Sequence, residues 1–116
     1  MDYKTARNFL GEQGRSLETG TKHDAFLVRL QKGQPPIPGQ ATYILLALKM
    51  AFEGLQDQPM LDREFALSLH LLAIQSLQLF DAGVKTGVIW PPMLKEDIER
   101  ISQGVKSIFT GTWESN

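Results

Sequence analysis

Apolar residues recur along most of the chain at intervals of three and four, the spacing that places side chains on one face of an α-helix. The stretch from about residue 93 to 109 is the clearest example. Its apolar residues follow one another at alternating steps of four and three: Leu94, Ile98, Ile101, Val105 and Ile108. No alternating apolar and polar stretch competes with this pattern, so the sequence predicts helices and no strands.

Glycine and proline divide the pattern into helical segments. A first helix is expected from Asp2, a potential cap, to about Gly20, where glycine suits the left-handed position after a helix. Thr21 and Asp24 resemble a capping box that opens a short second helix through Lys32. Three longer helices are expected at about residues 38–56, 63–85 and 93–109, the second of them capped by Asp62.

Two proline-rich segments, at residues 34–39 and 88–92, separate these helices. Proline removes a backbone donor and clashes with the preceding helical turn, so both segments are expected to be rigid, extended connectors. The pattern therefore predicts an all-α protein, an irregular four- to five-helix bundle with proline-rich connectors. Residues 1–111 form a single domain around the helix at residues 63–85, and residues 112–116 form a tail.

The two middle helices carry more leucine than a lone bundle needs. In the 38–56 helix, Leu45 and Leu46 continue the water-facing side, and only one of them can point fully to the core. In the 63–85 helix, Leu71 falls inside a polar stripe that consists of Glu64, Ser68, Gln75, Gln78 and Lys85. Either the short helix or a connector covers these leucines, or they form a dimer or partner interface.

The connectors and the tail contain further candidate partner contacts. Pro35, Pro36 and Ile37 belong to a PxxP spacing that could present a polyproline ridge to an aromatic groove. Trp90 precedes a second proline pair. The same residues also suit rigid connectors whose isoleucine and tryptophan pack inward. Trp113 either folds back onto the bundle or is an exposed anchor for a partner.

Composition and charge exclude several classes of function. The 116 residues suit one domain, and the net charge of −1 comes without the basic stripe expected of a nucleic-acid-binding protein. Cysteine is absent, which excludes disulfides, thiol catalysis and thiolate metal sites. The apolar runs are too short to cross a bilayer, and the N-terminus lacks the apolar run of a signal peptide. We expect a cytoplasmic protein without a membrane span.

No motif predicts a catalytic, cofactor or metal site. The segment at residues 14–22 differs from a phosphate-binding loop, because Thr21 separates Gly20 from Lys22 and a helix precedes it. His23 and His70 are the only histidines, and neither belongs to a metal-ligand spacing. The leading hypothesis is a non-catalytic helical protein–protein interaction module: an adaptor, assembly factor or regulator that binds a protein partner or forms a homodimer.

An alternative hypothesis is a small-molecule-binding or enzymatic bundle. Bundles can hold ligands between their helices, and His70 borders an apolar face of the 63–85 helix. The pocket would then lie near His70 and Trp90.

Three segments of the chain carry a resemblance: residues 1–10, residues 33–40 and residues 108–113. They resemble a small cyanobacterial protein family of uncharacterised function, some of whose members carry the label dethiobiotin synthetase. Dethiobiotin synthetases are larger α/β proteins with an intact phosphate-binding loop, and this sequence contains neither the strands nor the loop. The resemblance therefore implies a cytoplasmic, cyanobacterial setting and no catalytic residue.

Overall fold

The computed structural model describes residues 1–114, and this part of the chain is entirely helical apart from turns and connectors, as the sequence predicts. Its six helices are α1 (Tyr3–Gly14), α2 (Ser16–Thr19), α3 (Phe26–Gln31), α4 (Gln40–Leu55), α5 (Arg63–Lys85) and α6 (Leu94–Thr110). Residues 115 and 116 of the expected tail lie outside the described residues.

Local capping signals set several of the helix ends. The Asp2 carboxylate accepts a hydrogen bond from the Thr5 backbone N–H at 2.8 Å, which lowers the pKa of Asp2 below its ordinary value. Asp62 likewise accepts from the Phe65 N–H at 2.9 Å and opens α5. Gly111, with φ of 79°, ends α6 in the left-handed conformation. The caps at Asp2 and Asp62 agree with the sequence prediction.

The first predicted helix is broken at Arg15. α1 stops at Gly14, and the one-turn α2 follows before Gly20 ends it with φ of 65°. Gly14 packs against the backbone of Ser68 in α5, so closely that a Cβ at Gly14 would overlap the Ser68 carbonyl. The end of α1 is therefore positioned by a neighbouring helix, an interaction that the local sequence pattern does not show.

The predicted capping box at Thr21 and Asp24 was wrong. Residues 21–25 lie outside any helix, and α3 begins only at Phe26. The buried Phe26 N–H instead donates to the Gln13 side chain, whose Oε1 lies 3.1 Å away. α1 thus supplies the cap of α3, because a buried N–H at a helix start needs an acceptor from somewhere in the fold.

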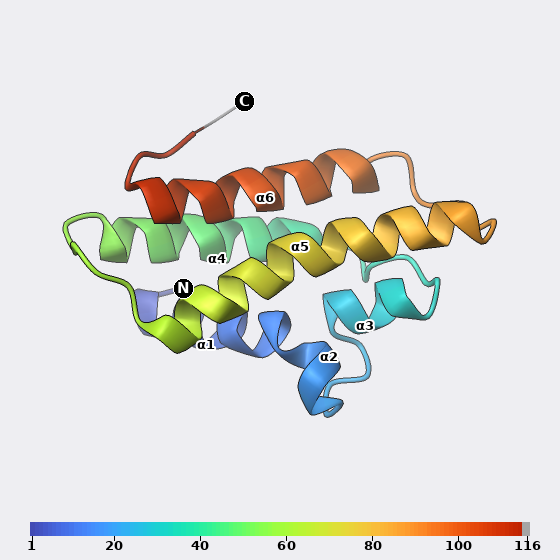
Figure 1. Ribbon diagram of the computed structural model, residues 1–116, viewed down its shortest axis with the longest axis horizontal. Helices are drawn as coiled ribbons and strands as arrows, with labels where there is room; N and C mark the ends of the chain where they lie inside the picture. The colour runs from blue at the N-terminus through green and yellow to red at the C-terminus, as the bar shows by residue number, and fades with distance from the viewer. Residues whose placement is uncertain (115–116) are drawn as a thin grey trace.

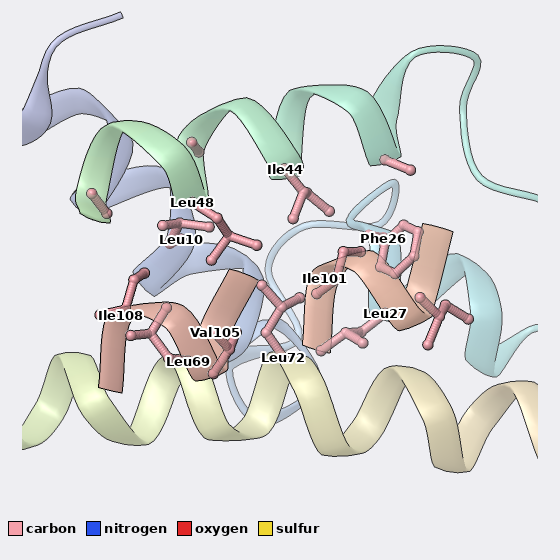
Figure 2. Packing of buried hydrophobic residues seen from close by; sticks show 14 of the residues in the cluster. Leu10, Phe26, Leu27, Ile44, Leu48, Leu69, Leu72, Ile101, Val105 and Ile108 are labelled. Atoms are coloured by element: carbon pink, nitrogen blue, oxygen red, sulfur yellow. The ribbon is translucent and has the colours of Figure 1, made fainter. Parts of the chain in front are cut away.

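The core lies where α1, α3, α4, α5 and α6 meet (Figure 2). Leu69 and Leu72 of α5 point toward side chains of α4 and α6, among them Leu48 and Val105. The apolar stripe predicted for residues 93–109 is the α6 contribution, and all five of its residues are buried. The 3–4 spacing there correctly identified the core face.

Figure 1 shows α5 running along most of the length of the molecule, with α1 to α3 on one side of it and α4 and α6 on the other. The molecule measures 44 × 32 × 22 Å. Its shortest dimension equals about two helix diameters, so the helices form two layers. In a two-layer bundle each helix retains one face at the surface, and the residues on that face decide what the protein can contact.

Candidate functional site

The ends of α5 are fastened to the rest of the bundle. At its start, the carboxylate of Asp62 pairs with the Arg7 guanidinium of α1 at 2.9 Å. Near its end, Trp90 packs on Gly83, and the Trp90 indole N–H donates to the Phe80 carbonyl at 3.0 Å. These contacts at both ends fix the rotation of α5 about its own axis, and therefore which side chains it exposes.

The inner face of α5 contains two buried serines among its leucines. Ser68 and Ser76 are buried, yet each hydroxyl donates to a carbonyl of its own helix, at 3.1 Å and 3.0 Å respectively. This local bond satisfies the hydroxyl without a partner from another helix. Small serines also let neighbouring helices approach closely, as Gly14 does at Ser68.

The outer face of α5 is apolar and exposed. Leu67, Ile74, Leu77 and Val84 remain 42%, 37%, 44% and 55% exposed. Together with two exposed polar residues they repeat at alternating steps of three and four, forming one line along the helix. We call this set the α5 stripe: Leu67, His70, Ile74, Leu77, Asp81 and Val84.

Neighbouring helices border the α5 stripe without covering it. Leu77 lines a shallow groove of about 260 Å³ whose other wall is formed by α6, including Ile98 and Glu99. On the opposite border, α1 approaches α5 at Ser68. The half-buried Leu71 lies beside the stripe on that border. In Figure 1, α5 runs across the front of the view.

The sequence pattern singles out Leu71 and His70 but not the four exposed aliphatic residues of the α5 stripe. The polar residues of the helix predict its water-facing side, yet Ser68 is buried and Gln75 is half-buried. The true outer face is rotated relative to that polar stripe. The signal that could have found it is the high leucine and isoleucine content on all sides of the helix, which indicates more apolar surface than one core contact requires.

The two candidate leucines of α4 differ in exposure. Leu45 is half-buried and packs against the core, whereas Leu46 remains 48% exposed. This split agrees with the expectation that only one of them could face the core. Leu46 has the polar Thr42 and Lys49 one helical turn away, and beside it lies Tyr43, which is 44% exposed and packs edge-on against Phe9. The apolar surface at Leu46 is therefore shorter than the α5 stripe.

The two proline segments meet at one end of the molecule. Pro36 and Ile37 share a groove of about 170 Å³ with Pro91 and Met93. Pro35 is exposed, and its carbonyl accepts a hydrogen bond from the Arg29 side chain at 2.7 Å. The structure thus brings together two segments that lie about fifty residues apart in the sequence.

Both tryptophans contact the bundle. Trp90 is buried, and its ring is stacked with that of Phe80 at a centroid separation of 6.0 Å. Trp113 is half-buried and folds back onto α4, where it packs beside Phe52 at 5.3 Å and beneath the Lys49 ammonium at 4.4 Å. Of the two arrangements considered for Trp113, the structure has the folded-back one.

The structure does not bring His70 and Trp90 together. His70 is exposed on the α5 stripe, whereas Trp90 packs against Gly83, about 20 Å further along the same helix. A groove of about 440 Å³ lies between α1 and the start of α5, where Arg7 is paired with Asp62 and Arg15 is paired with Glu18. Within residues 1–114, no three potential ligands converge as a metal ion would require.

By length and composition alone, α5 could also cross a membrane, and 28% of its most apolar window is buried in the bundle. The chain matches no protein-family model, no curated protein and no solved structure.

Proposed function

We propose that this protein is a non-catalytic helical protein–protein interaction module, an adaptor, assembly factor or regulator whose docking surface is the α5 stripe. The observation that carries the proposal is the exposure of four large aliphatic side chains along one helix face. Burying one such side chain completely stabilises by roughly 1.5–3 kcal/mol. Four that are about half exposed would together contribute a few kcal/mol on docking.

The spacing of these residues supports docking against another helix or a groove. Side chains at alternating steps of three and four lie on one line, which is how amphipathic helices contact partners. Scattered exposed leucines are common on protein surfaces, but an aligned set along a single helix is typical of an interface.

The surroundings of the stripe support a protein partner over a bilayer. His70 and Asp81 interrupt the stripe, and Arg63, Glu64 and Lys85 lie at its ends. Charged groups are costly in a bilayer core, whereas protein interfaces accommodate them. The opposite face of α5 belongs to the core, so inserting the helix into a bilayer would require the bundle to open.

We further propose that the protein acts in the cytoplasm. The absence of cysteine supports this location, since small secreted domains commonly rely on disulfides. The resemblance of the two ends and the first proline segment to a cyanobacterial family supports the same setting.

Site-specific photo-crosslinking in the native cell tests the docking surface. A benzophenone amino acid is placed at position 74 in the stripe, at position 46 on α4, and at position 53, an exposed polar site on α4. We expect a specific protein adduct at position 74 and none at position 53. An adduct at position 46 alone would move the docking surface to α4 and contradict the proposal.

A lipid control separates the membrane alternative. Purified protein is sedimented with anionic vesicles, alone and as the Ile74→Glu variant. We expect no binding in either case. Vesicle binding that Ile74→Glu abolishes would show that the stripe contacts lipid, and would overturn the assignment to a protein partner.

A further inference from the structure

We propose that the α5 stripe docks on a second copy of this chain, with the two α5 helices packed antiparallel about a two-fold axis. This inference rests on the proposed docking function and names its partner. The axis crosses α5 between Gln75 and Ser76, the midpoint of the stripe. A two-fold contact requires a surface that complements itself, and the stripe does so in both shape and charge.

The apolar residues complement one another in this register. Leu67 lies opposite Val84 of the second copy, and Ile74 lies opposite Leu77 of the second copy, because the members of each pair are equidistant from the midpoint. All four are exposed in the single chain. Each contact occurs twice, once on each side of the axis. The spacing of three and four matches the packing of helices at a shallow crossing angle.

The polar residues decide the register. His70 and Asp81 are the only polar members of the stripe, and they too are equidistant from the midpoint. An imidazole N–H donates to a carboxylate, so His70 of one copy pairs with Asp81 of the other, again twice. At the ends, the same arrangement brings Glu64 near Lys85 of the second copy.

Other registers leave charges unmatched. In a parallel pair, Asp81 would lie against Asp81 of the second copy, and like charges opposite one another disfavour association. In an antiparallel pair centred on Ile74, Asp81 would lie opposite Leu67 of the second copy and lose its water without gaining a partner. The proposed register pairs every polar member of the stripe with a suitable partner.

The length of the stripe sets the expected strength. From Leu67 to Val84 it extends about 26 Å along α5. A contact of one helix against another over this length is smaller than a standard stable interface, which places it among weak, reversible associations. We therefore expect a dimer with a dissociation constant on the order of micromolar.

Sedimentation equilibrium over a wide concentration range tests self-association. The average mass should rise from the 13.0 kDa of one chain toward twice that value, in a single reversible monomer–dimer step. Ile74→Glu should hold the protein at the monomer mass. Leu46→Glu changes a leucine outside the stripe that is more exposed than Ile74, 48% against 37%, and should leave the dimer intact. A monomer at every concentration up to about millimolar would overturn the proposal.

A charge exchange tests the register. His70→Asp places two carboxylates opposite each other on both sides of the two-fold axis and should weaken the dimer at least tenfold, or about 1.4 kcal/mol. Asp81→His removes the acceptor and should also weaken it. The double variant restores both pairs with their positions exchanged, so its affinity should return to within about threefold of the original. If the dimer affinity is the same in all three variants as in the original protein, the proposed register is wrong.

Engineered cysteines test the direction of the helices, and the absence of native cysteine makes the readout clean. Leu67→Cys and Val84→Cys are prepared separately, one with a cleavable tag that changes its size. Under mild oxidation, a mixture should give a disulfide between the two variants, and each variant alone should give much less. Efficient cross-linking of each variant to itself would show a parallel pair and overturn the inference.

Photo-crosslinking and sedimentation together distinguish a wrong partner from a wrong docking surface. If the photo-crosslinker at position 74 captures a different protein while the purified chain stays monomeric, the docking function stands and the second copy is the wrong partner. If position 74 captures nothing and the chain is monomeric, both proposals fail.

Discussion

The indole ring of Trp90 packs against Gly83 so closely that a side chain at position 83 would occupy the same space as the ring. The ring is also held by its hydrogen bond to the Phe80 carbonyl at 3.0 Å. Gly83 is buried within α5, where glycine costs helix stability relative to alanine. The glycine is therefore required by packing, and it allows the connector between α5 and α6 to close onto the helix.

Gly83→Ala should destabilise the protein although alanine is the better helix former. The added methyl displaces a large ring from a packed site, which typically costs about 1–3 kcal/mol. Urea denaturation followed by circular dichroism measures the change, and tryptophan emission should shift to longer wavelength as the ring becomes wetter.

Gly11→Ala provides the matched control, because a Cβ at this helical position meets no atom within 4 Å. Here we expect stabilisation by about 0.5–1 kcal/mol from helix propensity alone. Equal effects at positions 83 and 11 would contradict the packing role of Gly83.

Gly14→Ala should be more damaging than Gly54→Ala, because the two glycines face obstacles of different kinds. At Gly14 the methyl would overlap the backbone of Ser68, which no rotamer change can move. At Gly54 it would meet the ring of Tyr3, a half-buried side chain at the start of α1 that can turn aside. We expect a loss of about 3 kcal/mol or more at position 14 and under about 1.5 kcal/mol at position 54.

Thermal unfolding of both variants measures this difference. If Gly14→Ala were as mild as Gly54→Ala, α1 and α5 would not be in rigid backbone contact, and the break between α1 and α2 would need another cause.

The features that the sequence predicts correctly depend on residues within a turn or two of one another. Asp62 caps α5 through a residue three positions away, and the α6 core face follows from the spacing of Leu94 to Ile108. The features that it predicts wrongly depend on distant parts of the chain. Gly14 ends α1 because of Ser68, and Phe26 takes its cap from Gln13.

The same distinction explains why the exposed face of α5 could not be predicted from the sequence. A polar stripe on a helix indicates its water-facing side only when the polar residues need water. Ser68 and Ser76 satisfy their hydroxyls within α5, so they could be buried while Leu67, Ile74 and Leu77 were left exposed. Leu71 could be identified because it interrupted the assumed polar stripe. The α5 stripe can be identified only from the structure, because the positions of the neighbouring helices decide which residues of α5 stay exposed.

Gln13→Leu should destabilise the protein through α3 rather than through α1. The change keeps a side chain of similar size at a buried site but removes the Oε1 acceptor of the Phe26 N–H. A buried donor left without a partner costs about 1–3 kcal/mol. Hydrogen exchange measures the effect locally, and the amides of α3 should lose more protection than those of α4.

Gln31→Leu, at an exposed position of α3, provides the control and should change stability by no more than about 0.5 kcal/mol. Uniform loss of protection across all helices in Gln13→Leu would argue that the residue supports the core as a whole and not the start of α3.

Leu77→Glu and Leu72→Ala should separate docking from folding, because the two leucines lie on opposite faces of α5. Leu72 is fully buried, and truncating it should cost about 2–5 kcal/mol. Leu77 is 44% exposed, so the glutamate can reach water and the cost should be about 1 kcal/mol or less. Both are measured by urea denaturation at a concentration low enough to keep the chain monomeric. Leu77→Glu should then fail to associate while remaining folded, whereas a large loss of stability would mean that this face of α5 serves the fold itself.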